Sequence, residues 1–427
     1  AASIHYDTLP IGERGFLQGG AFIARSDDAS ASWYNPAGLV MHEVDSVSAS
    51  GSIFALASSE RSDGNTFNDF ITIPSFVGSI GHIYPNLVWA FSIVSPANAI
   101  SEVNSYSTGN YTSEDGLEYK DMKVFDRSSI SRHTLAPGIS FATSLNSKLR
   151  LGFGARVFNT GVKLDVEQYY ISHDSDGSDA TNTDNTYGSS FKYTLAAEAY
   201  NFRLELGAQY DLTSKLTIGA FARMLDISLA TPAVSFNVAA SSMGKDQARA
   251  ETLFIGTDGK FNYKYPTELM FGAAWSDENF DVELAVKYYS AINAFNMTEG
   301  LEGEVTTFTT AADSSSTTSS SRIVSYPSTK KSAESVVNIS VGGSYKLTDK
   351  FLLQGGVFTD GDPDQVSNNI GGTLGVTMFN NNSTSSFGLI YVQGSGEETV
   401  TAPFSGSTTV KSSNSILGLN ISGSVYF

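Results

Sequence analysis

The stretch 149-LRLGFGARVF-158 alternates between two kinds of side chain from end to end. Every odd position is apolar, whereas the even positions carry mostly arginine and glycine. Successive side chains of a β-strand point to opposite faces, so this pattern predicts a strand with one apolar and one polar or small face. The runs 202-FRLELGAQY-210 and 282-VELAVKYY-289 repeat it. One such run alone would also fit a half-buried sheet of a soluble protein.

The connections between the alternating runs separate these two possibilities. Short breaks rich in Asn, Asp, Ser and Pro predict tight turns at 85–86, 145–148, 211–214, 277–279, 347–349 and 380–383. Longer polar stretches alternate with them, at 59–70, 97–130, 172–187, 237–259, 294–331, 360–370 and 395–409. Together these connections join 14 strands, and short turns opposite long loops are typical of outer-membrane β-barrels. A soluble sandwich or propeller gives no reason for this asymmetry.

Composition excludes several other classes of protein. The 427-residue chain has only 16% charged residues and a formal net charge of −18, which argues against nucleic acid as a partner. It has no cysteine, which excludes a disulfide framework, a thiolate zinc site and a cysteine nucleophile. No run of about 18 apolar residues occurs, so helical membrane spans are excluded and a β-barrel is the remaining membrane architecture.

The two ends of the chain complete the predicted architecture. The last strand, 416-ILGLNISGSVYF-427, alternates and ends in an aromatic residue, like the signal that outer-membrane proteins present to their insertion machinery. Residues 1–45 do not alternate and are too apolar for a disordered tail. We expect them to form a partly helical hatch, or plug, inside a transmembrane barrel of residues 46–427. A chain beginning Ala1-Ala2 fits a secreted protein whose signal peptide has been removed.

A family resemblance supports this organisation. The stretch 15-GFLQGGAFIARSDDASASWYNPAGL-39 resembles the N-terminus of the FadL/TodX family of outer-membrane long-chain fatty acid and hydrocarbon transporters. The matching features are a Gly-Gly-Ala, the acidic turn 27–30 and the tripeptide Asn35-Pro36-Ala37. Further segments resemble the family in order along the chain: 87–96, 135–157, 202–223, 265–295 and 351–365.

The resemblance implies a 14-stranded barrel in the outer membrane of a Gram-negative-type bacterium, closed by the hatch. It also implies uptake of a hydrophobic substrate, which is captured near the loops, passed to a pocket touching the hatch and released sideways through a kinked early strand. A dry, apolar route suits such a substrate, because each buried methylene contributes about 0.8 kcal/mol.

The candidate residues in the hatch have two readings each. Pro36 disfavours helix at Asn35, so a break is expected there, either as a hinge or as a fixed turn. The large apolar hatch side chains either line the substrate pocket or pack the hatch against the wall: Phe16, Phe22, Ile23 and Trp33.

The candidate residues in the wall concern the headgroup and the exit. Arg156, on a polar face directed into the lumen, and Lys163, near a motif where family members carry basic residues, are candidates for meeting a carboxylate. Gly161 stands where the family can have arginine, so uncharged hydrocarbons remain as plausible as fatty acids. Candidates for a local departure from the wall are Pro74, Gly78 and Pro96, although Pro96 also suits a simple strand end.

No enzymatic function, metal site or cofactor is expected. The five histidines show no metal-binding spacing, and no nucleophile elbow or P-loop motif occurs. The acidic stretch 173–185 lacks the closing glutamate of a calcium loop. Expected partners are a hydrophobic small molecule, membrane lipids, lipopolysaccharide and the insertion machinery, with the protein itself a monomer. The alternative is a barrel without transport, whose loops dock a surface protein.

Overall fold

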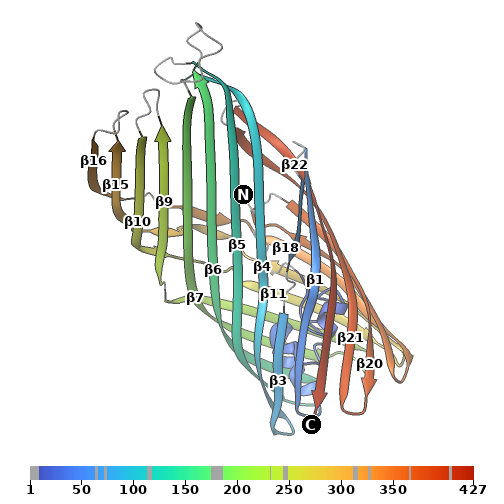
Figure 1. Cartoon of the computed structure of the whole chain (residues 1–427). Coiled ribbons are helices and arrows are strands. Elements are labelled where there is room, and N and C mark those ends of the chain that lie inside the picture. The colour runs from blue at the N-terminus through green and yellow to red at the C-terminus, as the bar shows by residue number, and fades with distance from the viewer. Residues whose placement is uncertain are drawn as a thin grey trace.

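The computed structural model describes residues 9–427 except for 63–65, 72–74, 113–117, 175–185, 231, 244–248, 311–315, 326–327, 365–366 and 403–405. The described residues form a closed antiparallel β-barrel with a sheet that rises above it (Figure 1). Pro74 and most of the acidic stretch 173–185 lie outside the described residues.

Fourteen strands form the closed wall, which confirms the predicted fold class. Each strand pairs antiparallel with its neighbours, and the ring closes where the first strand pairs with the last, from Ser46 opposite Tyr426 upward. In wall order they are β1 (Ser46–Arg61), β3 (Ser75–Tyr84), β4 (Leu87–Thr112), β5 (Glu118–Ser144), β6 (Leu149–Asp174), β7 (Thr186–Asp211), β8 (Leu216–Ala230), β11 (Glu268–Ser276), β12 (Phe280–Tyr289), β18 (Val336–Thr348), β19 (Phe351–Gly361), β20 (Ser367–Asn380), β21 (Ser383–Ala402) and β22 (Gly406–Tyr426).

The two ends of the barrel differ in how well the sequence predicted them. All six short turns are present at one end, the periplasmic end by the rule for such barrels. At the other end, the stretch 97–130 was predicted as a connection but is mostly strand, with β4 and β5 paired from Ala97 opposite Thr134 to Thr112 opposite Glu118. A ladder that rises into water carries polar side chains, so polarity was a poor sign of irregular structure there.

The apolar face of the wall changes sides partway up β7. Below Asn201 the buried inward residues include Arg203 and Glu205, while Leu206 points outward and is 46% exposed. Above Asn201 the inward residues are apolar and at most 5% exposed: Leu195, Ala197 and Ala199. This change marks the upper limit of the lipid-facing band, because outward side chains meet lipid below it and water above it.

Further strands extend the upper part of the wall. The upper half of β7 pairs with β9 (Ala233–Met243), which continues through β10 (Arg249–Phe261) and β15 (Glu302–Thr310) to β16 (Thr317–Ser325) (Figure 1). An aromatic and aliphatic core lies on the inward face of this sheet, around Phe236 and Phe254. The shorter strands are β2 (Thr66–Ile71), beside β1, β14 (Thr298–Glu299), beside β10, and the pair β13 (Ile292–Asn296) and β17 (Lys330–Ala333).

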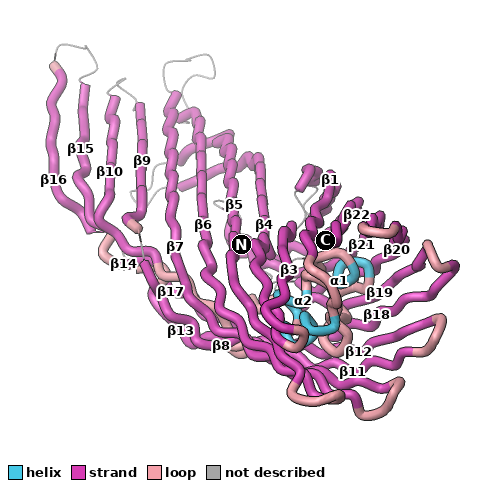
Figure 2. Tube along the Cα trace, turned by 90° about the horizontal axis from the view of Figure 1, so that it is seen from below, coloured by secondary structure: helices cyan, strands magenta, loops and turns pink. Residues whose placement is uncertain are grey.

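The N-terminal segment, residues 9–45, lies inside the lower barrel. It contains α1 (Arg14–Leu17), α2 (Ala31–Tyr34) and the 3-10 helix η1 (Pro36–Met41), which Figure 2 shows within the ring of strands. Most of its side chains are buried, and β1 begins directly after it. None of the described helices is long and apolar enough to cross a membrane.

Candidate functional site

Asn35 joins the N-terminal segment to the wall. Its Oδ1 accepts a hydrogen bond from Ala37 N (3.2 Å), and its Nδ2 donates to Ala208 O on β7 (3.1 Å) and Ala220 O on β8 (3.3 Å). The break predicted at Asn35 is present, because α2 ends one residue earlier and Asn35 is extended before Pro36. In this arrangement the tripeptide is an anchored turn.

Glycines on the inward face of the wall make room for the segment. A Cβ on Gly207 would overlap Asn35 Oδ1, and a Cβ on Gly152 would overlap the backbone of Ala37. Other wall glycines lie equally close to its earlier residues: Gly219, Gly272, Gly342, Gly356, Gly375 and Gly388. These glycines are therefore positions of close approach, where any larger residue would displace the segment.

Three arginines and two glutamates form a buried cluster in the wall. Glu205 accepts hydrogen bonds from Arg156 Nε (3.1 Å) and Arg223 Nε (2.8 Å). Glu268 accepts from Arg203 Nη1 (2.5 Å) and Arg223 Nη1 (2.6 Å). None of the five residues is more than 4% exposed, so each charge depends on its partners rather than on water.

This cluster also binds the N-terminal segment. Arg156 Nη2 donates to Ser32 O (2.8 Å) and Arg223 Nη2 donates to Trp33 O (2.9 Å), both in α2. The Arg223 guanidinium lies 4.0 Å from the centroid of a Trp33 ring. The excess positive charge of the cluster is thus directed at backbone carbonyls and an indole face, which are favourable partners for a guanidinium.

A neighbouring part of the wall, on β12, binds the segment through carboxylates. Glu283 Oε1 accepts hydrogen bonds from the backbone N–H groups of Ile23 (2.5 Å) and Ala24 (2.9 Å). Arg25 forms ion pairs with both Glu283 and Asp281. The segment is therefore held by arginines of β6 and β8 and by carboxylates of β12.

Titratable groups gather at the lower edge of the segment. His82 Nδ1 on β3 lies 2.7 Å from Asp45 Oδ1, and His82 Nε2 lies 2.8 Å from His42 O. The hydrogen bond from His82 lowers the pKa of Asp45, and burial raises the pKa of Asp28 to about 6.

An aromatic path leads from the upper sheet to the segment. Ring centroids lie 6.4 Å apart for Phe261 and Tyr263, 4.9 Å for Tyr263 and Tyr265, and 4.8 Å for Tyr265 and Phe158. Phe158 is in turn 6.1 Å from Trp33 in α2. At its upper end, Phe261 belongs to the apolar core of the sheet. We call these five residues the aromatic path.

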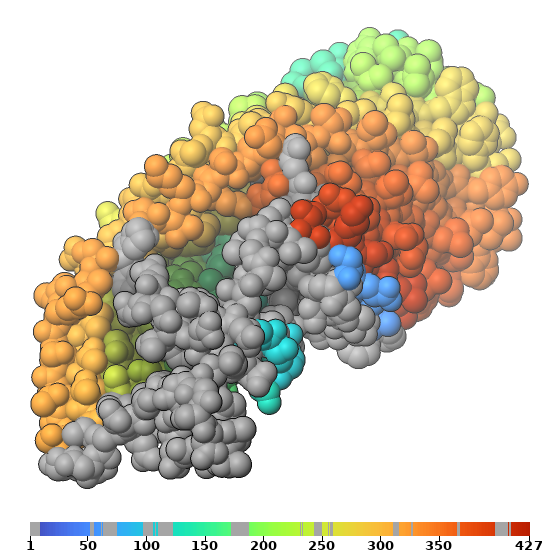
Figure 3. Space-filling view, turned by 90° about the horizontal axis from the view of Figure 1, so that it is seen from above, coloured from blue at the N-terminus to red at the C-terminus, as the bar shows by residue number. Residues whose placement is uncertain are grey.

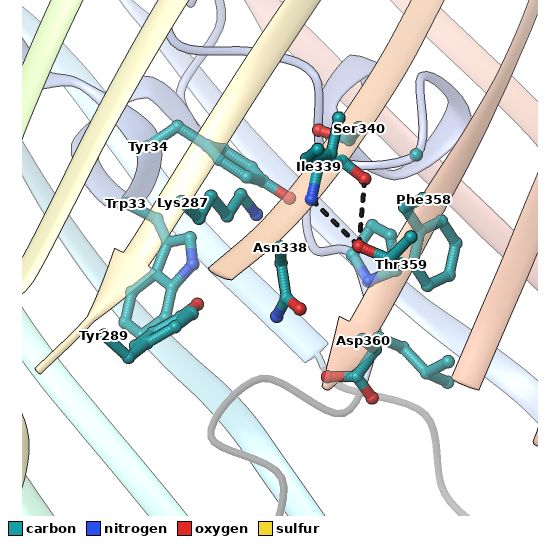
Figure 4. Close-up of a pocket in the computed structure, with 13 residues that line it drawn as sticks. Trp33, Tyr34, Lys287, Tyr289, Asn338, Ile339, Ser340, Phe358, Thr359 and Asp360 are labelled. Atoms are coloured by element: carbon teal, nitrogen blue, oxygen red, sulfur yellow. Dashed lines mark hydrogen bonds between the residues drawn. The ribbon is translucent and has the colours of Figure 1, made fainter. Parts of the chain in front are cut away.

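A cavity lies beside Trp33 at the lower end of the aromatic path. It is small, with a volume of about 30 Å³, so it would have to widen to hold an organic molecule. Figure 4 shows Trp33 and Tyr289 on one side, Phe358 on the other, and Lys287 and Asn338 between them. The Lys287 Nζ lies 5.3 Å from the centroid of the Tyr34 ring. From above, the molecule is hollowed between the orange late strands and the green middle strands (Figure 3).

The predicted hatch residues fall into two groups. Trp33 lines the cavity. Phe16 belongs to the buried cluster that includes Phe358, whereas Phe22 packs edge-on against Tyr34 at 5.8 Å and Ile23 packs against the wall. A role of these three in contacting substrate stays a prediction, and their geometry is that of packing residues.

The two predicted wall cations point in opposite directions. Arg156 is inward and 1% exposed, and its donors already bond to Glu205, Ser32 O and Ala136 O. Lys163 is outward, above the lipid-facing band, with its side chain 58% exposed and paired with Asp165 at 2.7 Å. The structure therefore does not bring Lys163 to the cavity.

Two of the three exit candidates, Gly78 and Pro96, lie in described residues, and their strand pairing differs. Gly78 is paired on both edges, with Ser48 and Ser92, and shows no departure from the wall. Pro96 lies in a register shift of β4 against β5, directly above the last β3–β4 pair at Ser95. Above that level β2 pairs with β1, and within the described residues no ladder joins β2 to β4.

Sequence reasoning missed two features of the site. Tyr263 and Tyr265 lie in 261-FNYKYP-266, where an aromatic residue at every second position was the available signal. The inward glycines occur on several of the alternating strands, but their partner was unknown. Among the described residues, no group of three or more His, Asp or Glu side chains is arranged to hold a metal ion.

Comparison with known proteins agrees with this architecture. Solved structures with similar folds include a Pseudomonas aeruginosa FadL homologue (TM-score 0.61, 12% identity, covering 99% of this chain and 100% of that one) and the Pseudomonas putida toluene transporter TodX (TM-score 0.58, 15% identity, 97% and 98%). The CymD monoaromatic hydrocarbon channel is also similar (TM-score 0.57, 14% identity, 99% of each chain). No curated protein matches significantly in sequence. The profile of the outer membrane protein transport family OMPP1/FadL/TodX matches residues 16–370. The chain therefore belongs to the OMPP1/FadL/TodX family of outer-membrane transport proteins.

Proposed function

We propose that this outer-membrane transporter takes up small hydrophobic molecules along the aromatic path and delivers them to the cavity beside Trp33. The observation that carries the proposal is the continuity of the path, whose successive ring centroids are no more than 6.4 Å apart. Aromatic faces and edges provide contact area for an apolar solute without requiring hydrogen bonds from it.

Passage beyond the cavity requires movement of the N-terminal segment, which acts as a hatch in this proposal. Its anchors are polar: Asn35 with backbone carbonyls, α2 with the arginine cluster, and Arg25 with Glu283 and Asp281. Such contacts can exchange for water. The buried apolar side chains of the segment, among them Phe16 and Phe22, must stay packed or repack against the wall during the shift. The region between β2 and β4, above Ser95, supports a sideways exit into the membrane.

Trp33→Ala tests the route. We expect uptake of radiolabelled toluene to fall by about tenfold, because the indole is the contact between path and cavity. Trp275→Ala is the matched control, since Trp275 points outward and is 43% exposed. Unchanged uptake in Trp33→Ala, with normal barrel folding on semi-denaturing gels, would contradict the proposal and favour the non-transporting alternative.

The headgroup preference has its own test. Lys287 lines the cavity and is the cation placed to receive a carboxylate. Lys287→Met should lower uptake of a long-chain fatty acid while leaving uptake of toluene unchanged. An equal loss for both substrates would show that Lys287 supports the cavity rather than recognising a carboxylate.

A further inference from the structure

A second hollow lies on the other side of the aromatic path, where three wall strands lose regular pairing at one level. β8 ends at Ala230, β10 and β11 are separated by residues 262–267, and β12 ends at Tyr289. The hollow between these breaks has a volume of about 560 Å³. We call it the fork pocket.

The fork pocket lies at the upper rim of the lipid-facing band. Outward apolar side chains lie below it on β11 and β12, among them Phe271 (57% exposed) and Tyr288 (38%), and Leu229 (55%) lies at its level on β8. At this level the pocket is lined by polar or small residues, all exposed except the half-buried Ser290: Ser228, Thr267, Ser290, Ala291 and Asn293. This is the height at which polar lipid headgroups surround a barrel in its membrane.

The inner lining is a preorganised set of hydrogen-bonding groups. Asn201 is 2% exposed, and its Nδ2 donates to Asp226 Oδ1 (2.8 Å) and Tyr263 O (2.9 Å). Asp226 Oδ2 accepts from Tyr265 N (2.8 Å). Asn201 Oδ1 has no hydrogen-bond partner, which is costly for a buried acceptor unless a ligand or water supplies a donor.

Backbone geometry at the same place is unusual. Leu225, next to Asp226, has φ +58°, a conformation that a leucine rarely adopts. The β7–β8 register shifts beside it, between Phe202 and Leu204. The shift turns the carboxylate of Asp226 toward Asn201 and the pocket, so local strain is used to place a polar group.

The lining indicates the chemistry of the ligand. Asn201 Oδ1, Asp226 and Glu299 are acceptors, Lys264 is a donor, and Tyr263, Tyr265 and Phe295 provide aromatic surface. Hydroxyl groups supply donors to such acceptors, and the flat apolar faces of sugar rings suit aromatic side chains. Two carboxylates against one ammonium disfavour a phosphate group. We propose that the fork pocket binds a neutral sugar residue, presented by the lipopolysaccharide that surrounds the barrel.

The test uses the full-length barrel in detergent and two probes: lipopolysaccharide truncated to its inner core, and the delipidated core oligosaccharide. Asn293→Trp would fill the mouth of the pocket from an exposed position, and Asp226→Asn would remove the carboxylate while keeping its shape. Asn368→Trp is the matched control, because Asn368 is exposed beside the outward Ile370 and away from the pocket. Semi-denaturing gels establish that each variant folds.

We expect both pocket variants to weaken lipopolysaccharide binding by at least tenfold, with the control unchanged. Binding of the free oligosaccharide with the same variant dependence would support sugar recognition independent of the lipid. Binding of lipopolysaccharide alone, with the same variant dependence, would assign the site to the lipid-borne headgroup. If neither probe binds, or if Asn293→Trp binds as tightly as Asn368→Trp, the proposal is overturned.

Discussion

The lower and upper halves of β7 differ in chemistry on the same inward face. Below Asn201 this face carries Arg203 and Glu205, which belong to the arginine–glutamate cluster that holds α2. Above it, Leu195 and Ala197 join an apolar core. The outward face changes in the opposite sense, from Leu206 below to Lys192 above. Where the outward face of β7 meets lipid, it is apolar and the inward face carries the charges. Where the outward face meets water, it is polar and the inward face is apolar.

The largest expected effect is in the lower half. Glu205→Gln leaves Arg156 and Arg223 buried without this counter-charge, which should cost about 3–5 kcal/mol of stability. Urea-induced unfolding in detergent measures it. Glu198→Gln, on the same strand but outward and exposed, should change stability by less than about 0.5 kcal/mol. Equal losses in the two variants would remove the distinction between the halves.

Two glycines of β7 provide the next comparison. Gly207→Leu places a side chain where Asn35 lies, whereas a Cβ on Gly188 has no contact closer than 3.9 Å. We expect Gly207→Leu to displace the N-terminal segment, and the overpacking should cost about 1–3 kcal/mol of stability. The displaced segment should let large antibiotics pass through the barrel. Single-channel conductance and antibiotic sensitivity measure this. An equally large leak in Gly188→Leu would contradict the conclusion that Gly207 makes room for the N-terminal segment.

A pH effect of up to about 3 kcal/mol is expected from Asp28 alone. Burial raises its pKa to about 6, above the value of about 3.9 for an exposed carboxyl. Because the folded pKa is the higher one, Asp28 stabilises the packed segment most at low pH, and this contribution is lost as the pH rises from about 4 to 6.

Hydrogen exchange of residues 9–45 should therefore speed up between pH 4.5 and 7, after correction for the intrinsic rate. In Asp28→Asn this pH-dependent increase in the exchange rate should disappear. If the pH dependence of exchange survives the substitution, it belongs to groups other than Asp28.

The smallest effect is expected at Lys163. Its exposed pair with Asp165 contributes less than about 1 kcal/mol. Lys163→Met should leave stability and the uptake of both fatty acid and toluene unchanged. A selective loss of fatty acid uptake would restore Lys163 as a headgroup residue and would require a route over the outer face of the wall.

Several parts of the architecture were predictable because they depend on local patterns. The 14 strands and six tight turns follow from a two-residue period and from turn-forming residues, and both are confirmed. The upper ends of the strands could not be predicted in this way, because the polarity of stretches such as 97–130 was taken to indicate a loop. Arg156 and Lys163 are a second example. The alternation assigns them to opposite faces of the wall, but their predicted contact with a substrate carboxylate was inferred from charge alone.

By itself, the sequence determined the barrel, the orientation of its faces and the non-alternating N-terminal segment, because each is a property of neighbouring residues. Only the tertiary structure decided which inward residues meet. Asn35 bonds to carbonyls 173 and 185 residues away. Phe158 on β6 meets Tyr265, from the segment between β10 and β11, and Trp33 in α2. Ring closure brings these groups together across the lumen, and no local pattern records what lies on the other side.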